Sequence, residues 1–313
     1  MKIVVMGVGA MGSIYAALLA DAGHEVWAID VWKDHIEAIR DQGLRVEGAS
    51  GDRVVQLNAA TDVSEVGICD LVIIATKASG VGTAAAAAQA VVGTHTVLLT
   101  IQNGLGSGER IARYYQGDNV LLGVAQGFGA SIEAPGHARH TSMSLIRIGA
   151  MASAENSAVQ ATVDRITGMW RDAGFNASSY SDIDQLIWEK FICNVAYSGP
   201  CTALNCTVEQ LLANPDAVAL SRQCAIEAFQ VAKAKGINLS FEDPVTYVTE
   251  FGQKLGPSRP SMLLDHLARR PSEIDAINGM VPVLASELGV SAPCNDALSR
   301  LLRAREALWE SPA

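Results

Sequence analysis

Residues 2–12 read Lys-Ile-Val-Val-Met-Gly-Val-Gly-Ala-Met-Gly, an apolar run that ends in a glycine-rich turn. The turn matches the pattern Gly-x-Gly-x-x-Gly, and the residues that follow it are rich in Ala and Leu. Four consecutive apolar residues after Lys2 and before such a turn predict a buried strand over residues 2–6, and the following pattern predicts a helix over residues 11–22. The segment therefore predicts a strand, a tight turn and a helix in immediate succession.

The glycines of this turn suit the binding of a pyrophosphate group. Gly7 permits the tight turn, Gly9 lets backbone N–H groups approach the phosphates, and Gly12 lets the helix pack closely on the strand. The helix N-terminus adds free amide donors and partial positive charge. We therefore expect an NAD(P)H site at Gly7, Gly9, Ala10, Met11 and Gly12, the alternative being an ordinary glycine turn.

The second predicted strand, residues 25–29, ends at Asp30. An acidic residue at this point accepts hydrogen bonds from the adenosine ribose hydroxyls and repels a 2′-phosphate. Asp30 therefore predicts a preference for NADH over NADPH, although Lys33, one turn later, would soften the repulsion. The alternative is that Asp30 caps the next helix and faces solvent.

The order of the remaining elements predicts two domains. The first half alternates buried strands with helices, and from about residue 181 the pattern is helical only. We expect an α/β Rossmann domain with a doubly wound, mostly parallel sheet over residues 1–181, and an all-α domain over residues 182–313. The expected strands are 2–6, 25–29, 71–75, 96–101, 120–124, 137–141, 144–149 and 175–180, with a small β excursion at 43–57. We expect 137–141 and 144–149 to be antiparallel strands, with a turn at 135–136. The expected helices are 11–22, 33–42, 81–91, 108–115, 183–198, 207–213, 217–235, 245–254, 272–288 and 295–309.

Composition narrows the class of protein. Hydrophobic residues make up 49% of the chain, charged residues 18%, and the formal net charge is −10. This acidic balance argues against nucleic-acid and anionic-membrane surfaces, which need clustered Lys and Arg. No apolar run is long enough to span a bilayer and no signal peptide is evident, so we expect a cytoplasmic protein. The six cysteines lack metal-ligand spacing, which predicts reduced thiols and no metal site.

Two polar residues follow predicted strands of the first half. Lys77 and Asn103 come after the third and fourth of these strands, at the edge of a parallel sheet where ligands bind. Lys77 is placed to meet a phosphate, and Asn103 to bond the substrate or the nicotinamide ribose. Taken alone, Lys77 is better interpreted as a solvated lysine and Asn103 as a turn asparagine.

The helical half begins with a candidate acid. Lys190 and Asn194 are four residues apart and share a helix face among many apolar neighbours. Loss of solvation there would lower the pKa of Lys190 towards the range useful for proton transfer. The alternative is a lysine that extends its ammonium to water from a surface helix.

Taken together, the motifs resemble the ketopantoate reductase (2-dehydropantoate 2-reductase) family nearly from end to end. They are the glycine turn, Asn103-Gly104, the pattern Trp188-x-Lys190-x-x-x-Asn194, Ser261-Met262-x-x-Asp265 and the later Glu273. The resemblance implies reduction of a 2-oxo acid, ketopantoate to pantoate of pantothenate biosynthesis, by hydride from NAD(P)H, with the substrate between the two domains. It also implies that Lys190 is the general acid and that Asn194 contacts a substrate hydroxyl. Ser261 would donate to the substrate carboxylate, and Glu273 would orient groups near the nicotinamide. Lys77 and Asn103 match cofactor and active-site loop positions.

Some positions depart from the family pattern and leave the substrate open. Ser198 stands where many members carry Asn, and Ser258 stands where some do. Asp30 stands near a position that is often basic in NADPH-specific members. Arg259 is an additional candidate for the substrate carboxylate, or a surface residue. One alternative is an NAD-dependent D-2-hydroxyacid dehydrogenase acting on branched or aryl 2-oxo acids. The other is a non-catalytic NAD(H)-binding sensor. An exposed apolar helix face in the second half could also pair two subunits as a homodimer.

Overall fold

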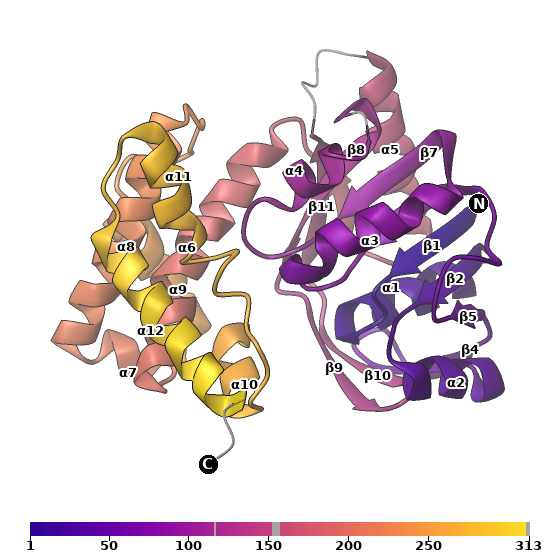
Figure 1. Ribbon diagram of the computed structural model, residues 1–313, viewed down its shortest axis with the longest axis horizontal. Coiled ribbons are helices and arrows are strands. Elements are labelled where there is room, and N and C mark those ends of the chain that lie inside the picture. The colour runs from indigo at the N-terminus through magenta and orange to yellow at the C-terminus, as the bar shows by residue number, and fades with distance from the viewer. Residues whose placement is uncertain (116, 152–156, 311–313) are drawn as a thin grey trace. The chain divides into compact units, whose positions relative to one another are not determined.

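The computed structural model describes residues 1–115, 117–151 and 157–310 (Figure 1). Contacts within the chain form two compact units. The first comprises Met1–Gln102 and Gly106–Ile183, and the second comprises Asn103–Leu105 and Asp184–Ala313. Whether residues 1–181 and 182–313 fold as independent domains stays a prediction.

An eight-stranded sheet forms the centre of the first unit. Its strand order is β12-β11-β8-β7-β6-β1-β2-β5, and every neighbouring pair is parallel except β11 and β8. Since β1 is flanked by β2 and β6, strand order reverses beside the first βα turn, where doubly wound sheets bind ligands. The strands are β1 (Lys2–Met6), β2 (Glu25–Ile29), β5 (Asn58–Ala60), β6 (Cys69–Ile74), β7 (Val92–Thr100), β8 (Val120–Gln126), β11 (Leu145–Ala150) and β12 (Ala177–Ser179). This arrangement confirms the predicted fold class.

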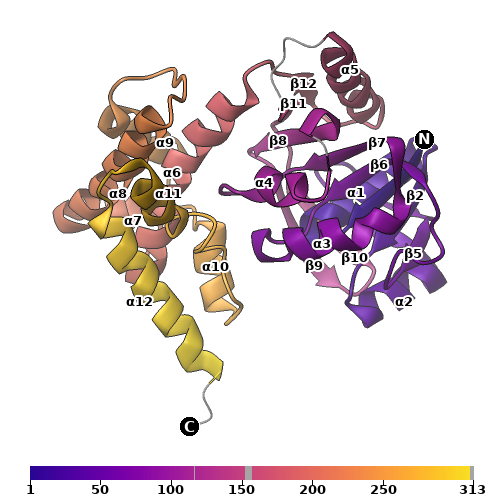
Figure 2. The same cartoon turned by 45° about the horizontal axis from the view of Figure 1, so that its top comes forward.

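Helices cover both faces of this sheet. On one face lie α1 (Ala10–Asp21) and α5 (Ser157–Asp172), where the rings of Tyr15 and Trp170 meet edge to face at 5.0 Å. Figure 2 shows α5 beside β11 and β12. On the other face, α3 (Val81–Ala87) packs beside α4 (Ser107–Ala112). The described core thus encloses α1 almost completely, which explains its apolar composition on all sides.

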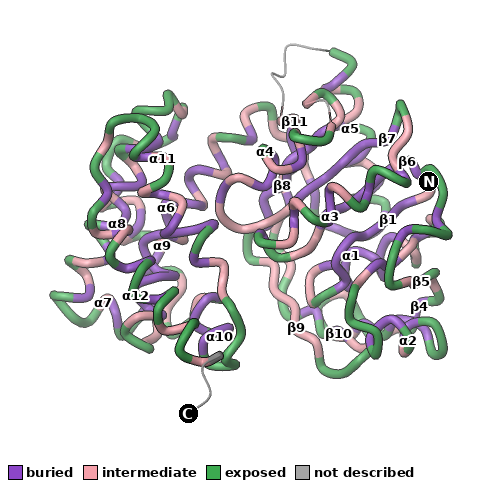
Figure 3. Tube along the Cα trace, in the orientation of Figure 1, coloured by how far each residue is buried: buried purple, intermediate pink, exposed green. Residues whose placement is uncertain are grey.

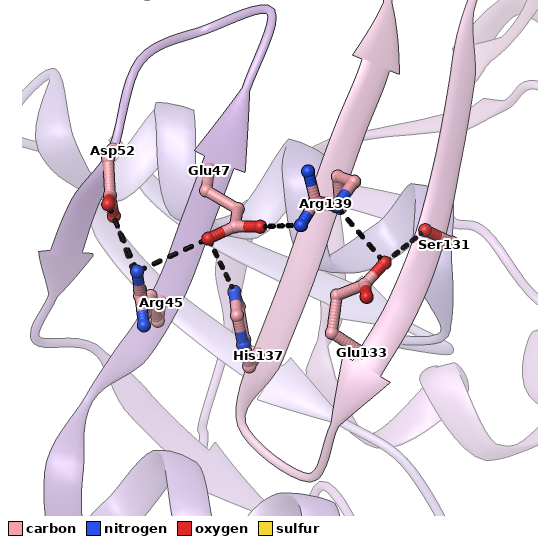
Figure 4. Close-up of polar contacts among 7 residues, drawn as sticks. All are labelled: Arg45, Glu47, Asp52, Ser131, Glu133, His137 and Arg139. Atoms are coloured by element: carbon pink, nitrogen blue, oxygen red, sulfur yellow. Dashed lines mark hydrogen bonds and ion pairs between the residues drawn. The ribbon is translucent and has the colours of Figure 1, made fainter.

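A second sheet of four strands packs against α1 on the side away from the large sheet. Its order is β4-β3-β10-β9, built from β3 (Leu44–Gly48), β4 (Arg53–Val55), β9 (Gly129–Ala134) and β10 (His137–Ser142). Its inner side chains, such as Leu44 and Ala138, join the core, and its outer face carries ion pairs (Figure 4). Glu47 of β3 pairs with Arg139 and His137 of the parallel strand β10. These cross-strand pairs favour the observed register of β3 and β10.

The order of strands in the two sheets corrects part of the sequence analysis. The segments expected at 137–141 and 144–149 are β10 and β11, which do not pair with each other but lie in different sheets. The turn at 135–136 instead joins β10 to β9, a strand that sequence reasoning missed. Helix α5 and strand β5 were missed as well. Pairing partners are set by tertiary packing, which a local pattern of alternation does not specify.

The second unit is helical. Its first helix, α6 (Ile183–Leu204), contributes to a core with α8 (Pro215–Ala234), α9 (Pro244–Leu255) and α12 (Pro293–Glu310). The buried stretches of α6 and α8 are visible in Figure 3. Shorter helices complete the unit: α7 (Val208–Leu212), α10 (Ser261–Leu267) and α11 (Met280–Leu288).

Two boundaries in this unit differ from expectation. Helix α6 continues past Pro200, although the missing N–H of a proline deprives the carbonyl four residues earlier of a helical partner. That carbonyl, on Ala196, accepts a hydrogen bond from Ser221 Oγ of α8 at 2.7 Å. The helix expected over residues 272–288 was also wrong in its first half. It begins only at Met280, and residues 272–279 form turns that we call the 272–279 loop. Side chains of α12 form hydrogen bonds with this loop at three residues. These tertiary contacts, and not the helical periodicity of the sequence, determine the conformation of the loop.

Candidate functional site

The glycine turn of the first unit has the geometry that its sequence predicts. Gly7 has a φ of +91°, and a Cβ there would lie 2.7 Å from the backbone nitrogen of Thr76. A Cβ on Gly12 would overlap the carbonyl oxygen of Gly7. Both glycines are therefore required by contacts within the protein itself.

Gly9 differs from these two glycines. A Cβ on Gly9 would meet no described atom within 4 Å, and Gly9 is exposed at the N-cap of α1. Protein packing does not require glycine here, whereas close approach of a ligand to the backbone would. Ala10 and Met11 follow in the first turn of α1, where backbone N–H groups lack helical acceptors. The turn therefore fits a pyrophosphate, and these five residues would hold it.

Asp30 and Lys77 flank this turn. The backbone nitrogen of Gly7 donates to the carbonyl of Ile29 at 2.7 Å, which places the glycine turn beside the residue before Asp30. Asp30 Oδ1 accepts from the backbone nitrogen of Trp32 at 3.0 Å. The N-cap of α2 (Lys33–Gln42) is Trp32, so Asp30 is not the helix cap of the alternative interpretation. Lys77 is exposed and directly follows Thr76.

A buried histidine, His35, is linked through Ser13 to the glycine turn. The sequence analysis did not identify it. His35 Nδ1 accepts from the backbone nitrogen of Gly136 at 3.0 Å, and its Nε2 lies 3.3 Å from Ser13 Oγ. Ser13 Oγ in turn donates to the carbonyl of Val8 at 2.8 Å. Because Nδ1 is an acceptor, the ring is neutral with its proton on Nε2, and burial lowers the pKa of His35. A histidine next to Ile36 on the apolar side of a short amphipathic helix was the available signal.

Lys190 and Asn194 lie in the second unit on successive turns of α6. Both are partly exposed, while the neighbouring Phe191 and Ile192 are buried. Burial lowers the pKa of Lys190 to about 8, and the attraction of Glu273 opposes this change. The structure thus brings Lys190 and Glu273 within electrostatic reach. An ammonium with this pKa is a competent proton donor near neutral pH.

Asn103 belongs to the same unit. The backbone nitrogen of Leu105 donates to the carbonyl of Ala276 at 3.0 Å, and Gly104 has a φ of +79°. A Cβ on Gly104 would come within 2.7 Å of the carbonyl carbon of Ala276. The segment that carries Asn103 is therefore held against the 272–279 loop that carries Glu273.

Ser261 is the first residue of α10 and is exposed, as is the neighbouring Arg259. Ser198 is buried on α6, and its carbonyl accepts from Thr202 Oγ1 at 2.6 Å. The roles expected for Ser261, Arg259 and Asn194 toward a substrate stay predictions.

Within residues 1–115, 117–151 and 157–310, no three His, Cys, Asp or Glu side chains gather as a metal site would require. Across the same ranges, no helix has the length and apolar character to cross a membrane.

Comparisons with known proteins agree with the motifs. The family description "Ketopantoate reductase PanE/ApbA" matches residues 3–153, and "Ketopantoate reductase PanE/ApbA C terminal" matches residues 182–306. The chain is 30% identical over 312 residues to the 2-dehydropantoate 2-reductase of Aquifex aeolicus, covering 98% of this chain and 97% of that one. It is 29% identical over 309 residues to the enzyme of that name from Streptococcus pyogenes serotype M3, covering 98% and 99%.

Solved structures give the same result. A D-mandelate dehydrogenase bound to NADH and anilino(oxo)acetate superposes with a TM-score of 0.90 at 25% identity, over the full length of both chains. A 2-dehydropantoate 2-reductase from Geobacter metallireducens has a TM-score of 0.88 at 28% identity, over 97% of this chain and 100% of that one. These matches confirm the resemblance that the motifs indicated.

Proposed function

Because the chain belongs to the ketopantoate reductase PanE/ApbA family, and is thus an oxidoreductase acting on CH–OH groups, we propose that it reduces ketopantoate to pantoate. The observation that carries the proposal is the placement of the motif lysine, Lys190, on α6 among buried apolar neighbours and within electrostatic reach of Glu273. Burial lowers its pKa to about 8, although the attraction of Glu273 opposes this change. A lysine extended into water from a surface helix would keep its ordinary pKa. Lys190 instead has the property that an acid catalyst requires.

The chemistry follows from these residue types. The residues of the glycine turn would hold NAD(P)H, which when bound would supply a hydride to the ketone carbon of the 2-oxo acid. Negative charge would then develop on the ketone oxygen. The Lys190 ammonium stabilises that charge and donates the proton that completes the hydroxyl group. The attraction of Glu273 raises the pKa of Lys190 against the effect of burial and so favours the protonated ammonium. Asn103, Asn194 and Ser261 would orient the substrate by hydrogen bonds.

The glycine turn would hold the pyrophosphate, with Lys77 near a phosphate and Asp30 at the adenosine ribose. The carboxylate of Asp30 would accept bonds from the ribose hydroxyls and repel a 2′-phosphate, so we propose NADH as the preferred cofactor. An NADH-bound relative of the same fold supports this preference.

A second candidate is an NAD-dependent D-2-hydroxyacid dehydrogenase. The full-length similarity to a D-mandelate dehydrogenase favours it. Ser198 and Ser258, at positions where many and some family members respectively carry Asn, favour it as well. Both candidates share the hydride chemistry and differ only in the side chain of the 2-oxo acid.

Oxidation of NADH and of NADPH, followed by absorbance with a panel of 2-oxo acids, tests both candidates. Turnover of ketopantoate above all others supports the first, and a profile of branched and aryl 2-oxo acids supports the second. Turnover of no 2-oxo acid would refute both and leave an NAD(H)-binding sensor. Lys190→Ala should abolish turnover and retain NADH affinity, whereas Lys233→Ala, at an exposed lysine on α8, should keep both. A wild-type rate in Lys190→Ala would refute the role of this residue.

The cofactor preference has its own test. Asp30→Asn keeps the shape of the side chain and removes its charge. The variant should lose the discrimination against NADPH, with kcat/KM for NADPH rising on the order of tenfold relative to that for NADH. A wild-type enzyme that already favours NADPH strongly would overturn this assignment.

A further inference from the structure

Three side chains of α12 hold the 272–279 loop. Glu306 Oε1 accepts from the backbone nitrogen of Ser272 at 3.1 Å and from its Oγ at 2.6 Å. Arg303 Nη1 donates to Asp275 Oδ1 at 2.7 Å. At the far end of the loop, Asn278 Nδ2 donates to the side-chain oxygen of an asparagine of α12 (Asn295) at 2.9 Å. Glu273, one residue beyond the first anchor, is thus carried by a loop that α12 fixes at both ends.

Asn278 also reaches the helix that carries Lys190. Its Nδ2 donates a second hydrogen bond to the carbonyl of Val195 at 2.9 Å, one residue after Asn194. The side chain is completely buried, so each of these bonds is made without competing water. Asn278 is therefore a direct link between the loop of Glu273 and the helix of Lys190.

Neighbouring residues on α6 and α12 fix the position of the Asn278 side chain. A Cβ on Gly199 of α6 would lie 2.5 Å from Asn278 Oδ1, so only glycine permits the asparagine to approach the helix this closely. On the other side, Asn295 is held by the buried Glu227 of α8, whose Oε2 accepts from the backbone nitrogen at 2.9 Å and from Nδ2 at 2.7 Å. The position of the Asn278 amide is thus determined from three helices.

We infer that Asn278 is a positioning residue for the reaction, and that it sets the Glu273 carboxylate against the Lys190 ammonium through its bonds to Val195 and Asn295. The inference rests on the proposed function of Lys190 as the acid. Asn278 acts through its bonds to Val195 and Asn295, which fix the separation of the loop from α6. If this separation grows, the attraction of Glu273 weakens, and the ammonium loses its proton at a lower pH. The other acid beside Lys190, Glu189 of α6, accepts from the backbone nitrogen of Ser240 at 2.8 Å and is not part of this link.

The test compares Asn278→Ala with a matched control, Ser221→Ala. The control also removes one buried hydrogen bond to a carbonyl of α6, that of Ala196, but does not touch the loop. For Asn278→Ala we expect kcat to fall by about 10- to 100-fold, with KM for NADH unchanged within about twofold. The alkaline limb of the kcat profile should move to lower pH. Ser221→Ala should lose stability without moving that limb.

Two further variants keep the test decisive if Asn278→Ala does not fold. Asn278→Ser has a hydroxyl that can donate to the carbonyl of Val195. Compared with Asn278→Ala, it should have a higher kcat and an alkaline limb closer to the wild-type pH. Gly199→Ala should displace the intact asparagine and reproduce the shift. The inference is overturned if Asn278→Ala or Asn278→Ser is less stable, as Ser221→Ala is, but keeps the wild-type kcat and the wild-type position of the alkaline limb.

A measurement that needs no turnover distinguishes failure of the proposed function from failure of the inference about Asn278. Titration of the Lys190 ε-carbon by NMR, with the signal assigned from Lys190→Ala, follows the ammonium directly. A lowered midpoint in Asn278→Ala supports the inference even if no 2-oxo acid is reduced. An unchanged midpoint refutes it even in an active enzyme.

Discussion

Replacing Lys190 with Met should remove turnover and stabilise the cofactor-free protein at neutral pH. Lys190 has a pKa of about 8 in the folded chain, against 10.5 for an unperturbed lysine. At about 1.4 kcal/mol per pKa unit, this difference corresponds to a destabilisation of about 3 kcal/mol. The side chain is partly exposed, and residual hydration reduces the figure, so we expect a gain of about 2 kcal/mol for Lys190→Met.

The pH dependence of that gain follows from the sign of the pKa change. Below about pH 8 the lysine is charged in both the folded and the unfolded chain, and the full cost of burying the charge is present. Above pH 10.5 both states are neutral and the cost is absent. The advantage of Lys190→Met should therefore be largest below pH 8 and shrink steadily as the pH rises to 10.5.

Urea unfolding of the wild type and of Lys190→Met, repeated across this range, measures the effect. Lys233→Met is the matched control, since Lys233 is exposed on α8 and pairs with Glu242 at 3.1 Å. Its free energy of unfolding should stay within about 0.5 kcal/mol of the wild type. The reasoning is refuted if Lys190→Met gains nothing at pH 7, or if its gain is the same at pH 7 and at pH 10.5.

Two other changes test the support of the sites. Gly12→Ala places a Cβ against the carbonyl oxygen of Gly7. The variant should be less stable by about 1–3 kcal/mol and should bind NADH more weakly in a fluorescence titration. Wild-type affinity for NADH would contradict the assignment of the turn. Glu227→Ala leaves the buried backbone and side-chain amides of Asn295 without their carboxylate acceptor. Thermal and urea unfolding should show a free energy of unfolding lower by about 3 kcal/mol, whereas Glu242→Ala, at an exposed residue, should change it little. Equal effects of the two substitutions would show that the buried bonds contribute nothing to stability.

Local pattern was sufficient wherever the deciding contacts are close in sequence. The strand over Lys2–Met6 and the helix over Lys33–Gln42 were predicted with the bounds that the structure shows. Their apolar residues repeat with the period of one element, and a glycine turn or a helix start lies beside each. The same holds for Gly12, because a Cβ there would overlap the carbonyl oxygen of Gly7 in the same turn.

Local pattern failed where distant segments determine the outcome. Residues 272–279 have the periodicity of a helix, yet they form turns because α12 bonds them at Ser272, Asp275 and Asn278. Strands β10 and β11 were recognised as strands, but nothing in their alternation assigned them to separate sheets. His35 was missed because its partners, Ser13 and Gly136, lie elsewhere in the chain.

By itself, the sequence determined the strand–turn–helix that suits a dinucleotide, the change from α/β to helical organisation, and the residue types of a reductase. These features depend on contacts within a few residues, which side-chain period and turn chemistry encode directly. Only the tertiary structure decided that Glu273 approaches Lys190 and that Asn278 reaches across 83 residues to the carbonyl of Val195. Such distances are set by how several helices pack at once, and the lowered pKa of Lys190 arises from that packing rather than from its neighbours in the chain.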